Sequence, residues 1–130
     1  MLAALVGGCH GRWYDRDNQG ELTGRRWVLQ VLTRDGGGIT SVPRDDDFTV
    51  EFDSNGDVSV QADCNQCGGT YQAGEARLGI SALACTRVFC TETAPFDTEF
   101  VEQLQASHSY FVEGRLLTIR TDDGVLVFDR

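Results

Sequence analysis

Apolar and polar residues alternate along much of this chain with the two-residue period of β-strands. The clearest case is a hairpin predicted over residues 48–52 and 58–62. Asn55 and Gly56 lie in its connection and supply the positive φ angles of a tight turn. The apolar positions of both strands should share one buried face: Phe48, Val50, Phe52, Val58 and Val60.

Three further elements follow from the same reading. Residues 27–32 are apolar on both faces, which predicts a fully buried first strand. Residues 116–120 and 125–128 predict a closing hairpin around an Asp-Gly turn. One helix is predicted over residues 94–105, with Pro95 in its first turn. Its apolar stripe consists of Phe96, Phe100, Val101 and Leu104.

The chain as a whole therefore belongs to the mainly β (α+β) class. Its fifteen glycines and two prolines suit many tight turns between short strands better than long helices. We expect seven to eight mostly antiparallel strands with one helix inserted late. Such strands usually close into a barrel or pack as a sandwich.

The charge of the chain excludes some partners. The formal net charge is −9, and all eleven basic residues are arginine. An acidic surface repels phosphate backbones and anionic lipid headgroups, so we expect no nucleic-acid partner and no direct membrane binding. With 130 residues, the chain can bury one core, and we expect it to be a monomer.

The N-terminal residues indicate export. No segment is apolar for the roughly 18 to 20 residues that a membrane span requires. Residues 1–8 are nonetheless apolar, end in two glycines and precede Cys9, like the end of a bacterial lipoprotein signal. We interpret residues 1–20 as a signal remnant and tether, with Cys9 as the lipidation site, and residues 21–130 as the domain. The alternative is a short disordered N-terminus with an incidental cysteine.

Four further cysteines form a cluster in the middle of the domain. Cys64, Cys67, Cys85 and Cys90 have the spacing C-x2-C, x17, C-x4-C. This spacing is compatible with a four-thiolate zinc site and with two disulfides formed in an oxidising compartment. A thioredoxin-like redox pair is a third interpretation, but Cys64 and Cys67 lack its strand-to-helix context. Four cysteines allow three pairings, which spacing alone does not separate.

The residues around these cysteines resemble the META domain, the HslJ-like family of bacterial envelope proteins. The resemblance covers about residues 22–129. The motifs that carry it are Asp63-Cys64-Asn65, Gly69-Thr70-Tyr71, Leu78-Gly79-Ile80, Leu83-Ala84, and Thr86 four residues before Cys90.

Three features depart from the family pattern. Asp63 stands where the family usually has glycine, and Val88-Phe89 stand where it usually has Met-Ala. Cys67 and Cys85 occupy positions where most relatives carry other residues.

The resemblance implies a small, lipocalin-like antiparallel β-barrel with one helix and a Cys64–Cys90 disulfide. Cys67 and Cys85 lie inside that loop and are the natural second pair, which leaves Cys9 for a lipid. The resemblance also implies a non-catalytic module on the periplasmic side of the cell envelope, lipid-anchored or secreted. Such a module would act in envelope stress or drug tolerance by binding an envelope protein or a small ligand. The rival interpretation is a zinc-stabilised interaction domain built on the four cysteines.

Other candidate sites have simpler explanations. Residues 15–21 resemble the start of a calcium loop, but Arg26 stands where the bidentate glutamate belongs. The acidic residues 45–47 and 53–57 could bind a cation weakly and are typical of turns beside strands. Trp13 and Tyr14, in the tether, could dock on the domain or contact a partner, whereas the strand context of Trp27 indicates core. We expect no metal and no cofactor.

The sequence contains few candidate catalytic residues. Ser107-His108-Ser109, placed between the helix and the next strand, could supply a nucleophile and a base. No acid partner or oxyanion motif accompanies these residues, and sequence neighbours rarely have triad geometry. We therefore expect that the chain is not an enzyme.

Overall fold

The computed structural model describes residues 21–43 and 45–130. Cys9, the tether, Trp13, Tyr14 and most of the calcium-like loop lie outside the described residues. The strands are β2 (Arg26–Arg34), β3 (Gly38–Thr40), β4 (Phe48–Phe52), β5 (Asp57–Ala62), β6 (Asn65–Gly74), β7 (Arg77–Ile80), β8 (Ala84–Cys85), β9 (Ser107–Glu113), β10 (Leu116–Thr121) and β11 (Gly124–Asp129). A 3-10 turn, η1 (Asp45–Asp47), precedes β4, and the helix α2 (Phe96–Gln105) precedes β9.

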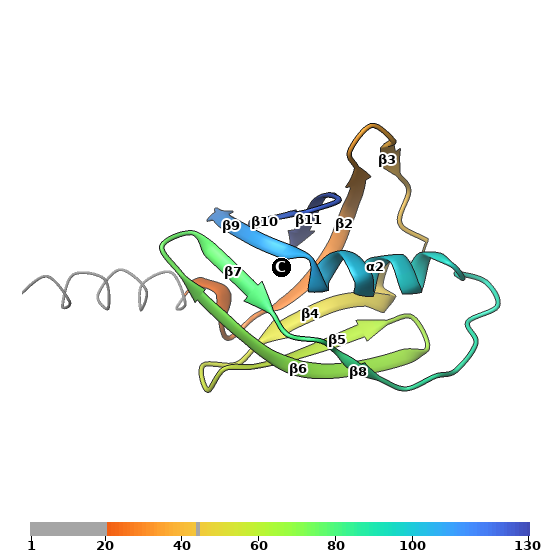
Figure 1. Cartoon of the computed structure of the whole chain (residues 1–130), viewed down its shortest axis with the longest axis horizontal. Coiled ribbons are helices and arrows are strands. Elements are labelled where there is room, and N and C mark those ends of the chain that lie inside the picture. The colour runs from red at the N-terminus through yellow and green to blue at the C-terminus, as the bar shows by residue number, and fades with distance from the viewer. Residues whose placement is uncertain (1–20, 44) are drawn as a thin grey trace, which may run out of the picture.

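Eight of the strands form a closed antiparallel barrel, the alternative that the family resemblance implies (Figure 1). The order around the barrel is β2, β4, β5, β6, β7, β9, β10 and β11, so neighbours follow one another along the chain. The barrel closes because β11 pairs with β2, from Gly124 beside Arg34 to Asp129 beside Val28. The short strands β3 and β8 pair with β2 and β6. Closure leaves no long unpaired edge on the main sheet.

The predicted central hairpin forms with the expected register. Val50 lies opposite Val60 and Phe52 opposite Val58, and all four side chains are buried. In the turn, only Gly56 has a positive φ, of 97°. Asn55 instead uses its side chain, whose Oδ1 accepts a hydrogen bond from the Asp57 N–H at 3.0 Å. The expectation of positive φ at both turn residues is therefore wrong for Asn55.

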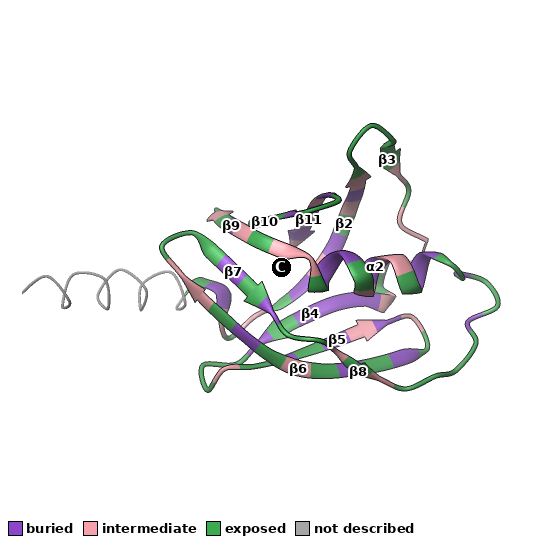
Figure 2. Ribbon diagram, in the orientation of Figure 1, coloured by how far each residue is buried: buried purple, intermediate pink, exposed green. Residues whose placement is uncertain are grey.

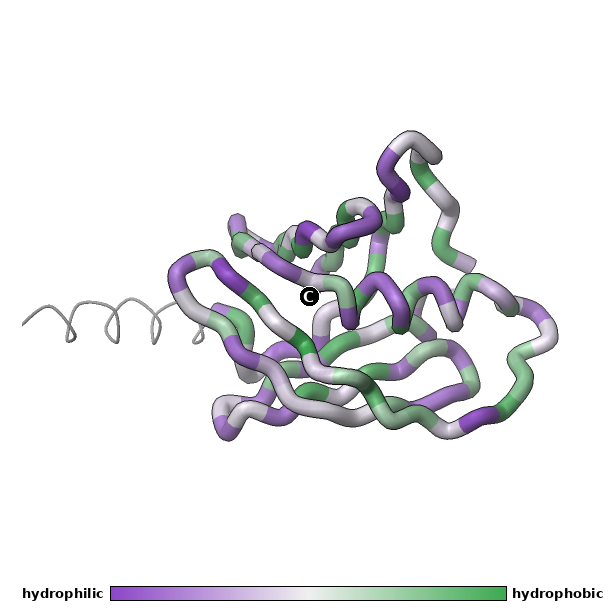
Figure 3. Tube along the Cα trace, in the orientation of Figure 1, coloured by the Kyte–Doolittle hydropathy of each residue, from purple (hydrophilic) through white to green (hydrophobic). Residues whose placement is uncertain are grey.

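The core fills the interior of the barrel. Figure 2 shows buried and exposed positions alternating along the strands, and Figure 3 shows hydrophobic positions following the same alternation. Trp27 is fully buried, and its indole N–H donates to the Leu22 carbonyl at 3.0 Å. This confirms Trp27 as a core residue. The Phe52 and Tyr71 rings meet edge to face with centroids 4.9 Å apart, a favourable aromatic geometry.

The helix closes one end of the barrel. In an antiparallel meander the end of each strand lies beside the start of the next. The end of β2 at Arg34 and the start of β11 at Gly124 therefore lie at one end of the barrel. The start of β4 at Phe48 and the end of β5 at Ala62 lie at the same end. The helix lies across this end (Figure 1). Its buried apolar side chains are Phe96, Phe100 and Leu104. The Phe48 ring packs edge to face against Phe96 at 4.9 Å and Phe100 at 5.6 Å.

The helix begins later than predicted. It starts at Phe96, and Pro95 occupies the N-cap position rather than the first turn. Among the described residues, no helix is long and apolar enough to cross a membrane.

Candidate ligand-binding site

Two disulfides lie beside the helix-covered end of the barrel. Cys64 is bonded to Cys90, and Cys67 is bonded to Cys85. The second bond joins directly opposite residues of β6 and β8. Together the two bonds tie the chain between β8 and α2, residues 86–95, to the start of β6. All four sulfurs are in S–S bonds, so a four-thiolate zinc site would require both bonds to be reduced.

Asn65 holds the same segment without covalent bonds. Its side-chain oxygen accepts hydrogen bonds from the Val88 N–H at 2.8 Å and from the Thr86 hydroxyl at 2.9 Å. Its Nδ2 donates to the Val88 carbonyl at 2.9 Å and to Cys90 Sγ at 3.4 Å. The Thr86 hydroxyl also accepts from the Gln66 N–H at 3.0 Å. Because Asn65 is only 8% exposed, water competes poorly for these bonds.

A groove lies between this segment and the helix, with a volume of about 680 Å³. We call it the α2 groove. Its apolar lining residues are Ala62, Cys67, Leu83, Cys85, Val88, Phe89, Ala94, Pro95 and Val101, and its polar ones are Asn65, Thr86, Arg87, Asp97, Thr98 and Glu102. Val88 is 56% exposed and Phe89 75% exposed. Two adjacent exposed apolar side chains beside a concave surface are typical of a binding site.

Asp97 is the buried acidic group of this groove. It occupies the first turn of α2 and is 8% exposed. Among the residues that the structure describes, none donates a hydrogen bond to its Oδ1. Buried carboxylate oxygens normally have a donor, and one without a donor costs free energy. Asp97 Oδ1 is therefore an unsatisfied acceptor in the wall of the groove, and a ligand could pair with it only when the carboxylate turns toward the groove, because this oxygen has almost no accessible surface.

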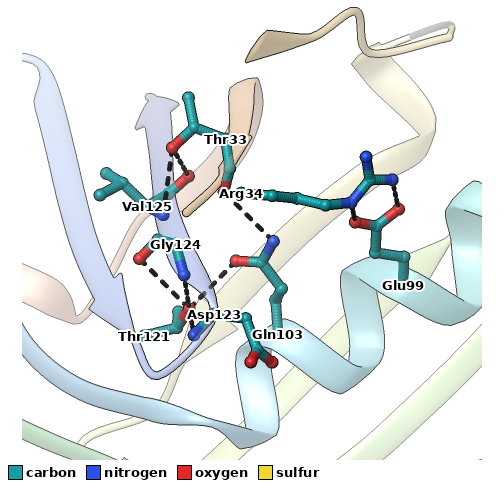
Figure 4. A network of polar contacts seen from close by, with 8 residues as sticks. All are labelled: Thr33, Arg34, Glu99, Gln103, Thr121, Asp123, Gly124 and Val125. Atoms are coloured by element: carbon teal, nitrogen blue, oxygen red, sulfur yellow. Dashed lines mark hydrogen bonds and ion pairs between the residues drawn. The ribbon is translucent and has the colours of Figure 1, made fainter. Parts of the chain in front are cut away.

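The other side of the helix is fixed to the barrel by a polar network (Figure 4). Gln103 is 2% exposed, donates to the Thr33 carbonyl at 3.3 Å and accepts from the Thr121 hydroxyl at 3.1 Å. Thr121 in turn accepts from the Gly124 N–H at 2.9 Å. These bonds join α2 to β2, β10 and β11.

An ion pair lies beside this network. Arg34 forms a bidentate pair with Glu99, whose hydrogen-bonded carboxylate raises the pKa of the Arg34 guanidinium. Arg34 is exposed, so water screens the pair and it adds little to stability.

Comparison with known proteins identifies the family of this chain. The model of the META domain matches residues 20–130. This chain belongs to the META-domain family. No curated protein matches it.

Solved structures share the fold. A protein from Burkholderia xenovorans, determined by NMR, superposes with a TM-score of 0.71 at 22% identity, over 90% of this chain and 88% of that one. The crystal structure of a DUF4847-family protein from Bacteroides vulgatus gives 0.63 at 14% identity, over 85% of this chain and 95% of that one. These identities support the fold alone.

The departures of this META domain from the family pattern lie around the groove. Asp63, where glycine is usual, has φ of 56°, in the left-handed region that favours glycine. Its carboxylate accepts a hydrogen bond from the Thr93 hydroxyl at 2.7 Å, which adds a contact to the segment before the helix. Phe89, where alanine is usual, places a large exposed ring beside the groove.

The remaining sequence candidates are not brought together into a site in the described part of the META domain. His108 is exposed and lies within β9, not before that strand as predicted. The Ser107 hydroxyl donates to the Leu104 carbonyl at 2.6 Å. Residues 53–56 form the β4–β5 turn, Asp57 begins β5, and residues 45–47 form η1. Asp63 lies within 4.8 Å of the Cys64 and Cys90 sulfurs, but those sulfurs are bonded to each other.

Sequence reasoning missed Asp97 and Gln103. Both read as ordinary polar positions of an amphipathic helix. No sequence pattern marks Asp97 as buried, because an acidic residue in the first turn of a helix is normally solvent-exposed.

Proposed function

We propose that this META domain is a monomeric, non-catalytic binding module of the cell envelope and that it binds a small ligand in the α2 groove. The observation that carries the proposal is the exposed Val88-Phe89 pair beside a groove that is also lined by Asp97, whose Oδ1 is buried without a donor among the described residues. Exposing two large apolar side chains to water is unfavourable, and a ligand that covers them would recover that free energy.

The size and stiffness of the groove support a small ligand. A volume of about 680 Å³ falls within the range of roughly 300–1,000 Å³ that is typical of small-molecule sites. One wall is the helix, fixed by Gln103. The other wall is held by the Cys64–Cys90 bond and by Asn65. A preformed site avoids much of the entropy cost of ordering loops on binding.

The disulfides support an oxidising compartment, because reducing cytosolic conditions disfavour structural disulfides. We propose that the protein is exported and is either lipid-anchored through Cys9 on the periplasmic side or secreted. We further propose that ligand binding serves envelope stress or drug tolerance, the role that the family resemblance implies.

A neutral fluorescent amphiphile tests the binding proposal. N-phenyl-1-naphthylamine should gain fluorescence with the full chain, and Phe89→Ser should weaken its binding several-fold. Phe111→Ser is the matched control, because Phe111 is 56% exposed on β9 and does not line the groove. If both variants bind like the unmodified chain, or if the probe does not bind, the proposed site is wrong.

Mass spectrometry of protein from its native host tests the export proposal. After alkylation without reduction, Cys64, Cys67, Cys85 and Cys90 should remain unmodified, and all four should react after reduction. A lipid mass on Cys9 would support anchoring. Four cysteines alkylated without reduction would contradict the proposed compartment.

A further inference from the structure

We propose that the ligand of the α2 groove is an organic cation, a protonated amine on an apolar body, and that Asp97 is its counter-ion. This inference rests on the proposed function and names the class of ligand. It starts from Asp97, which is more than nine-tenths buried, lines the groove and has an oxygen without a donor among the described residues. A protonated amine supplies a hydrogen-bond donor and a positive charge in one group.

The charges around the groove favour a cation. Asp97 and Glu102 both line it, and among the residues that the structure describes Arg87 is its only basic lining residue. Arg87 is exposed, so water screens its charge more strongly than that of Asp97. The whole chain has a net charge of −9, which also attracts cations and repels anions.

The rest of the lining explains why the cation needs an apolar body. Leu83, Val101 and the Cys67–Cys85 bond form apolar walls, and Val88 and Phe89 extend them outward. A bare metal ion or a polyamine would leave these surfaces in water. An aryl or alkyl group attached to the amine would cover them while the amine reaches Asp97.

An isosteric ligand series tests the inference without altering the protein. Tryptamine, tryptophol and indole-3-acetate share an indole body and carry an ammonium, a hydroxyl and a carboxylate. Titrations followed by NMR chemical shifts of the full chain should give tryptamine a dissociation constant on the order of tenfold lower than tryptophol. Indole-3-acetate should bind more weakly still. The shifts should map to the α2 groove.

Two variants connect this preference to Asp97. Asp97→Asn keeps the shape and removes the charge, so it should abolish the preference for tryptamine over tryptophol. Glu113→Gln makes the same charge change at an exposed residue of β9 outside the groove and should retain the preference. The NMR spectrum of each variant shows whether it is folded.

The possible failures are distinguishable. Equal binding of tryptamine and tryptophol in the groove would overturn the cation inference and leave the proposed function standing. Full retention of the preference by Asp97→Asn would also overturn the cation inference and leave the proposed function standing. Water or another group would then be the hydrogen-bond donor to the Asp97 carboxylate. If N-phenyl-1-naphthylamine does not bind in the groove, the proposed function fails as well.

Discussion

The side chain of Asn65 hydrogen-bonds both main-chain groups of Val88, accepting from its N–H at 2.8 Å and donating to its carbonyl at 2.9 Å. An amide side chain can replace a neighbouring strand in this way, because it offers one acceptor and one donor side by side. The segment between β8 and α2 has no strand partner at Val88. Asn65 therefore gives this wall of the groove a fixed position that a disulfide alone would not provide.

Asn65→Asp should destabilise the fold by roughly 2–3 kcal/mol. The substitution keeps the shape and the acceptor, but it replaces the donor with a charged oxygen that faces the Val88 carbonyl. Gln66→Glu is the control, because it makes the same charge change at an exposed neighbouring residue and should have little effect. Urea unfolding at pH 7 measures both. The deficit of Asn65→Asp should shrink as pH falls toward about 4, because burial beside the Val88 carbonyl raises the pKa of the new carboxyl group, which takes up a proton and can then donate.

The two disulfides should contribute unequally. The Cys64–Cys90 bond encloses a separation of 26 residues, and its loss as a Cys→Ala pair should cost about 3 kcal/mol on the chain-entropy model. The Cys67–Cys85 bond is nested inside that loop, so its ends are already held close in the unfolded chain. Its removal alone should cost less. Denaturant unfolding of the two double variants checks the order, and a larger loss for the inner pair would contradict it.

Gly124 should tolerate no side chain. A Cβ placed there would lie 1.8 Å from the Thr33 carbonyl oxygen, since β11 and β2 approach closely where the barrel closes. Gly124→Ala should therefore cost roughly 3 kcal/mol or more, because the clash is with backbone rather than with a flexible side chain. Gly79→Ala is the matched control, a strand glycine with open space around the added carbon. Similar unfolding midpoints for the two variants would show that β11 can move away from β2.

Tyr71 should make stability fall at alkaline pH. Burial, and secondarily the negative charge of Asp53, raise the pKa of its phenol, which also donates to the Asp53 carbonyl at 2.7 Å. The unfolded chain releases this proton at about pH 10, whereas the folded chain holds it to higher pH. The stabilisation is therefore complete below pH 10 and is lost as pH rises through the folded pKa.

Unfolding free energies of the unmodified chain and Tyr71→Phe, compared between pH 9 and pH 11.5, isolate this effect. The difference between the two proteins should decrease as pH rises through this range. A difference that does not change with pH would contradict the assignment.

Much of the barrel could be predicted because its strands carry regular patterns. The hairpin from Phe48 to Ala62 alternates strictly, and its register follows from which residues are apolar. β6 is harder to predict, since the buried residues of its first half are Asn65 and Cys67. The cysteine spacing pointed to Cys67, and only the resemblance to the META domain pointed to Asn65.

The close packing of Gly124 could not be predicted from the sequence, for a different reason. Gly124 follows two aspartates and reads as a turn residue, but it is the first residue of β11, pressed against β2. A close approach between residues 91 positions apart is a property of barrel closure, which no local pattern contains.

The groove could not be predicted for the same reason. Asp97 reads as an exposed first-turn acid that suits the positive end of the helix dipole. Residues 86–95 form the opposite wall of the groove because Asn65 and the disulfides hold them beside the start of β6, an arrangement that no local pattern contains.

The most direct test of the account is a chemical-shift map of the full chain titrated with N-phenyl-1-naphthylamine. The account predicts saturable shifts concentrated on Leu83, Val88, Phe89, Asp97 and Val101, along the two walls of the α2 groove. Shifts concentrated instead on the exposed Phe111 and Leu116 of β9 and β10, or no saturable shifts, would contradict it.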